Sequence, residues 1–202
     1  MRYAMVFAVI TSALVLTSQA NAADTYTLDP AHTTVCFFVR HLGISNIPGK
    51  FKEFTGSLVL DGDTLKEATA TIQVQSVDTG VAQRDNHLRT ADFFDAAQYP
   101  VITFKTKRVE KDEKQVVVVA DFTMRGVTKE LRLPVTLNGP IKDPWGNMRV
   151  GLEAKLKLNR KDYGIHYNQV LESGIPAVGD EVEIILNAEA TKNTTDKNTP
   201  VK

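Results

Sequence analysis

The chain has 202 residues, with 24 basic and 24 acidic side chains, and its formal net charge is therefore zero. A chain without excess positive charge lacks the electrostatic footprint of a nucleic-acid binding protein, and its one cysteine, Cys36, excludes an intramolecular disulfide. The length suits a single domain with a sizeable core, so we expect the fold to depend on packing and any ligand to be recognised by shape or apolar contact.

The first 22 residues have the three parts of a secretory signal peptide. Arg2 provides a positive charge, the apolar run AMVFAVITSALVL follows it, and small residues at 20 and 22 form a cleavage pattern. The apolar run is shorter than the about 20 residues that a membrane-spanning helix needs. We therefore expect cleavage after Ala22 and a periplasmic mature chain of net charge −1 without a membrane anchor. An uncleaved anchor is the alternative.

Alternation of apolar and polar residues predicts strands along most of the remaining chain. In the stretch 127–137, Val127 and every second residue from Leu131 to Leu137 share one apolar face, and most of the residues on the other face are polar. The other predicted strands are at residues 26–29, 33–41, 50–61, 67–76, 101–109, 115–124, 150–159 and 181–190. Turn residues separate these stretches, which indicates antiparallel hairpins.

Eight or more antiparallel strands must close into a barrel or split into a sandwich to protect their edges. Long strands joined by short hairpins favour an up-and-down barrel, and we assign residues 23–191 to this all-β domain. An eight-stranded barrel is wide enough to hold a small ligand. Residues 192–202 are polar, and we expect them to form a disordered tail.

Residues 79–98 interrupt the strand pattern with a predicted short helical insert. Asp78 or Thr79 is placed to cap a helix through GVAQRDNHLR, and Thr90 is placed to cap a second helical turn through ADFFDAAQ. Tyr99-Pro100 is expected to end the insert, because the residue before a proline leaves the helical region.

The insert also concentrates the charged and titratable residues Arg84, Asp85, His87 and Arg89. Asp85 beside His87 could perform acid–base chemistry. However, Asp85 and Arg89 are helix neighbours of opposite charge, so ion pairs that hold the insert over the barrel are the stronger interpretation. The sequence has no nucleophile motif, no nucleotide-binding loop and no metal-ligand spacing. We therefore predict no enzyme activity, no cofactor and no metal.

His41 continues a strand face that begins with Val35, Phe37 and Val39, and the apolar members mark this face as the inner one. Two interpretations of His41 stay open. It is either a hydrogen-bonded core residue or a group that meets the polar end of a ligand near the mouth of a hollow barrel. Cys36, on the same strand, is expected to act as a small hydrophobic residue.

Five stretches together resemble the YceI-like family of periplasmic, lipocalin-like proteins. They are DPAHTTVCFFVRHLG at 29–43, GKFKEFTGSL at 49–58, SVDTGVAQRDNHLRTADFFDAAQYPVITFKT at 76–106, GVTKELRLPVTLNG at 126–139 and DPWGNMRVGLEAKLKLNRKDYGI at 143–165. The resemblance implies an extended antiparallel, lipocalin-like β-barrel with a long internal cavity. It also implies binding of amphiphiles with long apolar chains, such as polyisoprenoids, isoprenoid quinones or fatty-acid derivatives.

On this interpretation the protein is a periplasmic carrier that sequesters such an amphiphile inside its barrel. The insert forms part of the cavity wall or a lid, and its arginines favour a polar or anionic head group. Within the resemblance, the predicted ligand-binding residues are Phe37, Val39, His41, Phe54, Arg84, His87, Leu88, Phe93, Phe94, Phe104, Phe122 and Trp145.

Two other hypotheses remain open at the level of sequence. One is an enzyme that acts on a lipid or isoprenoid head group through His41, His87 and Asp85. The other is a stress-response module with a filled core and no ligand. A homodimer is compatible with each of them, because a second copy could cover an exposed barrel mouth.

Overall fold

The computed structural model of the protein describes residues 23–111 and 115–193. The predicted signal peptide and the predicted tail beyond residue 193 lie outside the described residues. Asn193 still belongs to the ordered domain, because its backbone N–H donates to the carbonyl of Thr25 over 2.8 Å. Within the described residues, no helix is long and apolar enough to cross a membrane.

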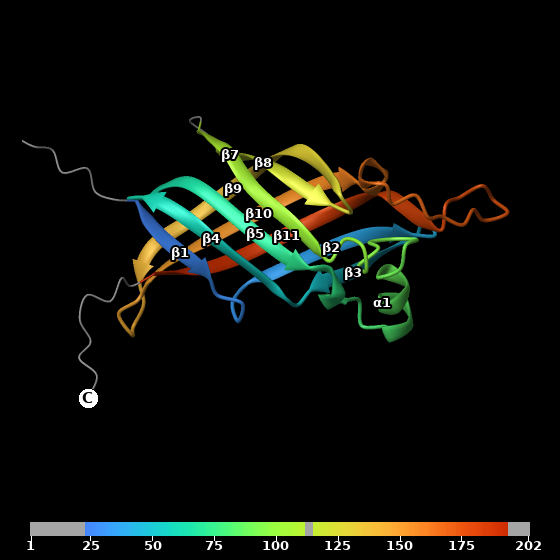
Figure 1. Ribbon diagram of the computed structural model, residues 1–202, viewed down its shortest axis with the longest axis horizontal. Coiled ribbons are helices and arrows are strands. Elements are labelled where there is room, and N and C mark those ends of the chain that lie inside the picture. The colour runs from blue at the N-terminus through green and yellow to red at the C-terminus, as the bar shows by residue number, and fades with distance from the viewer. Residues whose placement is uncertain (1–22, 112–114, 194–202) are drawn as a thin grey trace, which may run out of the picture.

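Eight antiparallel strands form a closed ring, which confirms the predicted barrel (Figure 1). In ring order the strands are β1 (Asp24–Leu28), β4 (Phe54–Asp61), β5 (Thr64–Gln73), β7 (Val101–Lys111), β8 (Val116–Met124), β9 (Val127–Lys142), β10 (Met148–Asn159) and β11 (Val178–Lys192). Pairing of β1 with the end of β11, at Ala190 to Lys192, closes the ring. Closure leaves no free edge along this part of the sheet.

Three further strands extend the barrel at one end. β2 (Thr34–His41) pairs with the first part of β11, β3 (Ser45–Phe51) pairs with β2, and β6 (Val77–Asp78) pairs with the end of β3. The prediction of one strand over residues 50–61 was wrong. Phe51 and Phe54 are both buried although they are three residues apart. Because a continuous strand would place them on opposite faces, the chain bends between β3 and β4.

The interior of the barrel is divided into two apolar clusters. One, which we name the solid half, is built mainly from β1, β4, β5, β8, β9, β10 and β11, and several of its residues have no exposed surface, among them Leu60, Val118 and Ala120. The second cluster gathers side chains from β3, β7, β8, β10 and the insert. Strands β8 and β10 pass through both clusters, so the same strands build both halves.

The predicted insert contains one helix, α1 (Ala82–Leu88), preceded by a 3₁₀ turn η1 (Val74–Ser76). The prediction that Asp78 or Thr79 caps the helix was wrong, because the N-cap residue is Val81, whose side chain cannot accept a hydrogen bond. Thr79 instead donates its backbone N–H and its hydroxyl to the Asp85 carboxylate. The second helical turn predicted after Thr90 is not formed. Residues 91–99 run as successive turns, and Asp95 has a φ of 52°, which interrupts a right-handed helix.

Candidate functional site

A cavity of about 370 Å³ lies within the second apolar cluster, at the end of the barrel where β2 and β3 extend the sheet. The cavity is enclosed by β2 and β11, by the ends of β5, β7, β8 and β10, and by the insert that contains α1. Most of its lining side chains are apolar. The volume lies at the lower end of the range for small-molecule pockets. The cavity is confined to this half and is therefore shorter than the resemblance implied. We name this half the hollow half.

The structure brings nine of the twelve predicted ligand-binding residues to this cavity. They come from β2, from the insert and from β8. The nine residues are Phe37, Val39, His41, Arg84, His87, Leu88, Phe93, Phe94 and Phe122.

The other three predicted residues do not line the cavity. Phe54 is buried at the start of β4, and Phe104 packs between the two apolar clusters. Trp145 lies on the turn between β9 and β10 and is 81% exposed. The Asp143 carboxylate accepts the backbone N–H groups of Trp145 and Asn147 over 2.9 and 2.8 Å. These hydrogen bonds fix a turn that carries the indole away from the barrel interior.

Aromatic rings line the cavity in two groups. The first begins on β2, where the ring centroids of Phe37 and Phe51 are 5.7 Å apart, and continues from Phe51 to Phe94 over 5.6 Å. The second lies within the insert and the loop before β11, where Phe93 and Tyr167 pack at 4.9 Å. Such tilted and edge-on contacts stabilise aromatic pairs beyond their burial. The two groups therefore form an apolar wall that an unbranched or isoprenoid chain can contact.

His87 joins this aromatic wall and does not form the predicted pair with Asp85. Its ring stands edge-on to Phe93 and Tyr167, with centroids 5.0 and 4.9 Å away. Its Nε2 lies 2.8 Å from the carboxylate of Asp92. The Asp85 carboxylate is occupied by Thr79, over 2.8 and 2.6 Å. The acid–base pair on which the enzyme hypothesis depended is thus absent from the described structure.

The ion pair predicted between Asp85 and Arg89 is also not formed in the described structure. Arg89 instead donates to the backbone carbonyls of Gln75 and Val77, both over 2.9 Å. On the far side of the insert, Arg125 donates to the carbonyl of Ala91 over 2.8 Å and also to the carbonyl of Gly164. Charge-assisted hydrogen bonds to carbonyls, more than ion pairs, therefore hold the insert over the cavity.

Arg84 is held within the insert, with part of its guanidinium available. Its Nε donates to the Thr79 hydroxyl over 2.7 Å, and its Nη2 donates to the Thr79 carbonyl over 2.9 Å. Its Nη1 has no hydrogen-bond partner within the described part of the chain. Because Arg84 lines the cavity, this fixed guanidinium is a candidate donor for a ligand head group.

Arg160 is a cavity-lining residue that the sequence analysis missed. It lies in the 3₁₀ turn η2 (Arg160–Tyr163) and is only 3% exposed. Its guanidinium donates to the carbonyls of Ile165, Tyr167 and Gly179, and it pairs with Asp180 over 3.0 Å. Burial lowers the pKa of Arg160, and Asp180 opposes this effect. Its hydrogen bonds define the path of the loop before β11, so we assign it a structural role.

Sequence alternation indicated some of the remaining wall residues but not others. Val182 and Ile184 line the cavity from β11, and they were visible as alternating apolar residues of a predicted strand. Tyr167, Gln169 and Ala177 line it from the loop between η2 and β11, where no periodic pattern exists. Only the closure of the barrel brings that loop to the cavity.

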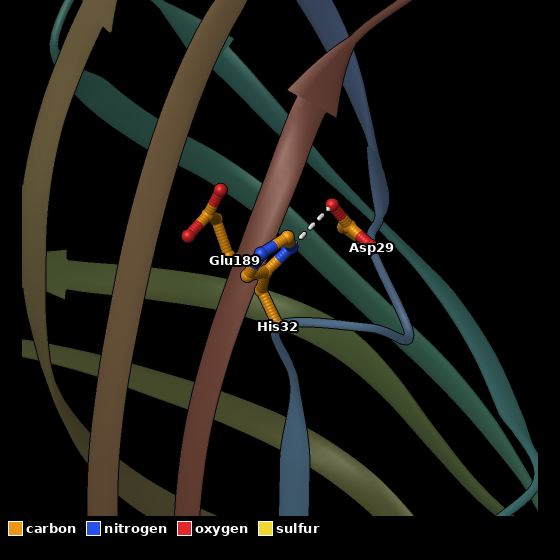
Figure 2. Close-up of side chains that lie close together, drawn as sticks. All are labelled: Asp29, His32 and Glu189. Carbon is orange, nitrogen blue, oxygen red and sulfur yellow. Dashed lines mark hydrogen bonds and ion pairs between the residues drawn. The ribbon is translucent and has the colours of Figure 1, made fainter. Parts of the chain in front are cut away.

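A group of possible metal ligands lies in another region, where β1 ends (Figure 2). Ligand atoms of Asp29, His32 and Glu189 lie within 4.8 Å of one another, and the figure shows His32 bonded to Asp29. The Arg149 guanidinium donates to both carboxylates, over 2.9 and 2.5 Å, and to Asp143 over 2.8 Å. The positive charge of Arg149 already satisfies these carboxylates, so the geometry is that of an ion-pair network.

The same network changes the acid–base properties of its carboxylates. The hydrogen bonds from His32 and then Arg149 lower the pKa of Asp29 to about 2. For Asp143, burial alone would raise the pKa, but hydrogen bonds from Arg149 and Asn147 lower it to about 2. Both carboxylates are therefore charged at neutral pH. Through Arg149 they connect the end of β1 and the β9–β10 turn to β10.

A second hollow, of about 430 Å³, lies over the other end of the barrel. Charged surface residues such as Asp63, Lys66 and Lys111 line it together with apolar ones. Leu65, a buried residue of the solid half, also lines it, but the fully buried Leu60 and Val118 do not. The cavity beneath the insert is therefore the better candidate for a binding site.

The fold and the cavity together define a class of protein, the antiparallel β-barrel with an apolar pocket at one end. A family model described as the YceI-like domain matches residues 26–190. The chain belongs to the YceI-like family, which confirms the resemblance in its sequence.

Known proteins support the assignment to this family. Protein YceI of Escherichia coli O157:H7 is 38% identical over 177 residues, which cover 86% of this chain and 89% of that protein. The crystal structure of Burkholderia cenocepacia BcnA has a TM-score of 0.71 at 23% identity and covers 81% of this chain and 99% of its own. A polyisoprenoid binding domain from Saccharophagus degradans has a TM-score of 0.65 at 18% identity, and covers 83% and 98%. The two structures share the fold.

Proposed function

We propose that the protein is a periplasmic carrier that binds a long-chain amphiphile, with the apolar chain in the cavity and the head group at its mouth. The observation that carries this proposal is the apolar, aromatic-walled cavity beneath the insert, which is bordered by a few polar groups. The Saccharophagus degradans barrel of the same fold is described as a polyisoprenoid binding domain, which supports an isoprenoid as the ligand class. The predicted signal peptide supports the periplasm.

The volume of the cavity limits the length of chain that it encloses. A volume of about 370 Å³ holds on the order of a dozen chain atoms, if each takes the about 30 Å³ that a water molecule occupies in the liquid. Each methylene group transferred from water contributes about 0.8 kcal/mol, which is about fourfold in affinity. We expect affinity to rise with chain length up to about this number of atoms and then to level off, because further atoms remain outside.

Polar residues at the cavity are suited to a head group more than to catalysis. Arg84 has an unused Nη1 beside the cavity, and His41 and Gln169 also line it. Head-group recognition needs only such donors, whereas acid–base catalysis needs a base within hydrogen-bond reach of the reacting proton. The Asp85 carboxylate is already bonded to Thr79. We therefore propose binding without enzyme activity.

The first experiment is native mass spectrometry of the protein purified from its own periplasm, followed by solvent extraction and lipid analysis. The expected result is a stoichiometric adduct that releases an isoprenoid or fatty derivative. A ligand-free mass that does not change after incubation with farnesol, geranylgeraniol and palmitic acid would contradict the proposal and favour a ligand-free role.

A pair of variants in α1 tests the role of Arg84. Arg84→Ala should lower the occupancy of an adduct with an anionic head group, while the melting temperature changes little. Arg89→Ala is the matched control, because Arg89 holds the insert to two carbonyls but does not line the cavity. Arg89→Ala should therefore lower the melting temperature more. Normal occupancy in Arg84→Ala, with a lower melting temperature, would assign Arg84 to bracing the insert instead.

A further inference from the structure

Large apolar side chains that remain exposed gather around the mouth of the cavity. Within the described residues, seven such side chains are exposed, and five of them border this end of the barrel. We name these five the apolar rim, and they are Ile44, Val81, Val170, Leu171 and Ile175. The two with the largest exposed fraction are Ile44, at 77%, and Val170, at 68%.

The rim is built on ordered segments that contact one another. Ile44 lies at the tip of the β2–β3 hairpin, and the neighbouring backbone N–H of Leu42 donates to the carbonyl of Ala177 over 2.9 Å. The loop before β11 folds back on itself, because Leu171 donates to the carbonyl of Ile175, also over 2.9 Å. Figure 1 shows this hairpin and this loop projecting from the end of the barrel near α1. The rim residues are therefore presented outward by fixed backbone.

The projecting segments contain almost no charge. Residues 41–49 contain no Asp, Glu, Lys or Arg, and residues 163–179 contain only Glu172, whereas 24% of the whole chain is charged. Loops that face water alone are usually polar or charged, and exposed apolar groups that cluster mark an interaction surface. Uncharged tips with protruding isoleucine, valine and leucine suit a lipid bilayer, because apolar side chains insert at its surface and charges are costly in its interior.

We propose that the apolar rim inserts into the surface of a lipid bilayer, so that the amphiphile moves between bilayer and cavity without crossing water. This inference rests on the proposed function, because contact between the cavity opening and lipid matters only if the ligand is apolar. The position of the rim supports a bilayer as the occupant, since its residues lie on segments that also line the cavity. Residues beside the rim, such as His41 and Ala177, line the cavity itself.

The test measures vesicle binding and ligand uptake for two matched variants. Ile44→Asn removes an apolar rim residue that does not line the cavity, and Ile141→Asn removes one that is 63% exposed on β9, outside the rim. Vesicles contain equal parts of phosphatidylcholine and phosphatidylglycerol, with farnesol as the cargo. Co-sedimentation measures binding, and native mass spectrometry measures farnesol uptake from vesicles and, separately, from detergent solution.

Ile44→Asn should lower vesicle binding by about tenfold and slow farnesol uptake from vesicles, while uptake from detergent is unchanged. Ile141→Asn should behave like the unmodified protein. Equal vesicle binding in both variants, or no vesicle binding by the unmodified protein, would overturn the role of the rim. A dimer that Ile44→Asn dissociates, without vesicle binding, would also overturn it and assign the rim to a second copy. Failure to take up farnesol, geranylgeraniol and palmitic acid from detergent would instead refute the proposed function.

Discussion

Two alanine substitutions, one in each half of the barrel, test whether one half is solid and the other hollow. Leu60→Ala and Ile184→Ala each remove three carbon atoms. Leu60 has no exposed surface and belongs to the solid half, whereas Ile184 is partly exposed and lines the cavity. The chemistry of the change is matched, so a difference in stability reports on the surroundings of the two side chains.

The expected costs follow from burial and from the void that each substitution leaves. Three carbon atoms are worth about 2.4 kcal/mol at about 0.8 kcal/mol each. Leu60→Ala also creates a new cavity in packed surroundings, so its total cost should be about 3–4 kcal/mol. Ile184 already faces a cavity, so Ile184→Ala should cost only about 1–2 kcal/mol. The difference of about 2 kcal/mol corresponds to about 4–8 °C in melting temperature for a domain of this size.

The assay is urea unfolding of ligand-free protein, because a bound ligand would add its own stabilisation to every measurement. The two variants should have the same slope and different midpoints. Farnesol is then added, and the gain in unfolding free energy is measured for each variant relative to its ligand-free form. This gain should be larger for Ile184→Ala than for Leu60→Ala if the enlarged cavity still contacts the farnesol chain. Equal losses of about 3–4 kcal/mol in the two ligand-free variants would show that the hollow half is packed, and would refute the reasoning.

Two further predictions concern the cavity wall and the acid response. Gly49→Ala should lower farnesol occupancy, because the added Cβ would lie 2.1 Å from the Phe37 ring and would force that ring to move; normal occupancy with an unmoved ring in a crystal structure would contradict this. Asp143→Asn should flatten the acid-induced loss of stability. The pKa of Asp143 is lowered to about 2 by Arg149 and Asn147, so its stabilisation is present above the ordinary carboxyl pKa of about 3.9 and is lost as pH falls from about 4 toward 2. Thermal melts between pH 2 and 7 measure the effect. Parallel curves of melting temperature against pH for Asp143→Asn and the unmodified protein would count against it.

Strand periodicity was sufficient to predict the barrel but not its division into two halves. Alternation tells which residues of β4, β7 and β8 face inward, and Phe54, Phe104 and Phe122 all satisfy it. Whether an inward residue fills the barrel or borders a void depends on the side chains that meet it from other strands. Only Phe122 of these three reaches the cavity, and no single strand carries that information.

The insert shows the same limit for polar residues. The i, i+4 rule correctly places Asp85 and Arg89 as helix neighbours, yet each finds partners outside the helix. Backbone N–H and carbonyl groups of non-repetitive segments need hydrogen bonds when they are covered, and the two charged side chains satisfy them. Trp145 was misplaced for a related reason, because the carboxylate of Asp143 determines the direction of its turn.

The division of the barrel separates the residues that pack its core from those that border its cavity. Strand β8 contributes Val118 and Ala120 to the solid half and Phe122 to the hollow half. Substitutions at the hollow ends of such strands can reshape the pocket while their other ends continue to close the ring. Evolution could therefore change the size and shape of the cavity through a few side chains, while every intermediate sequence still folds.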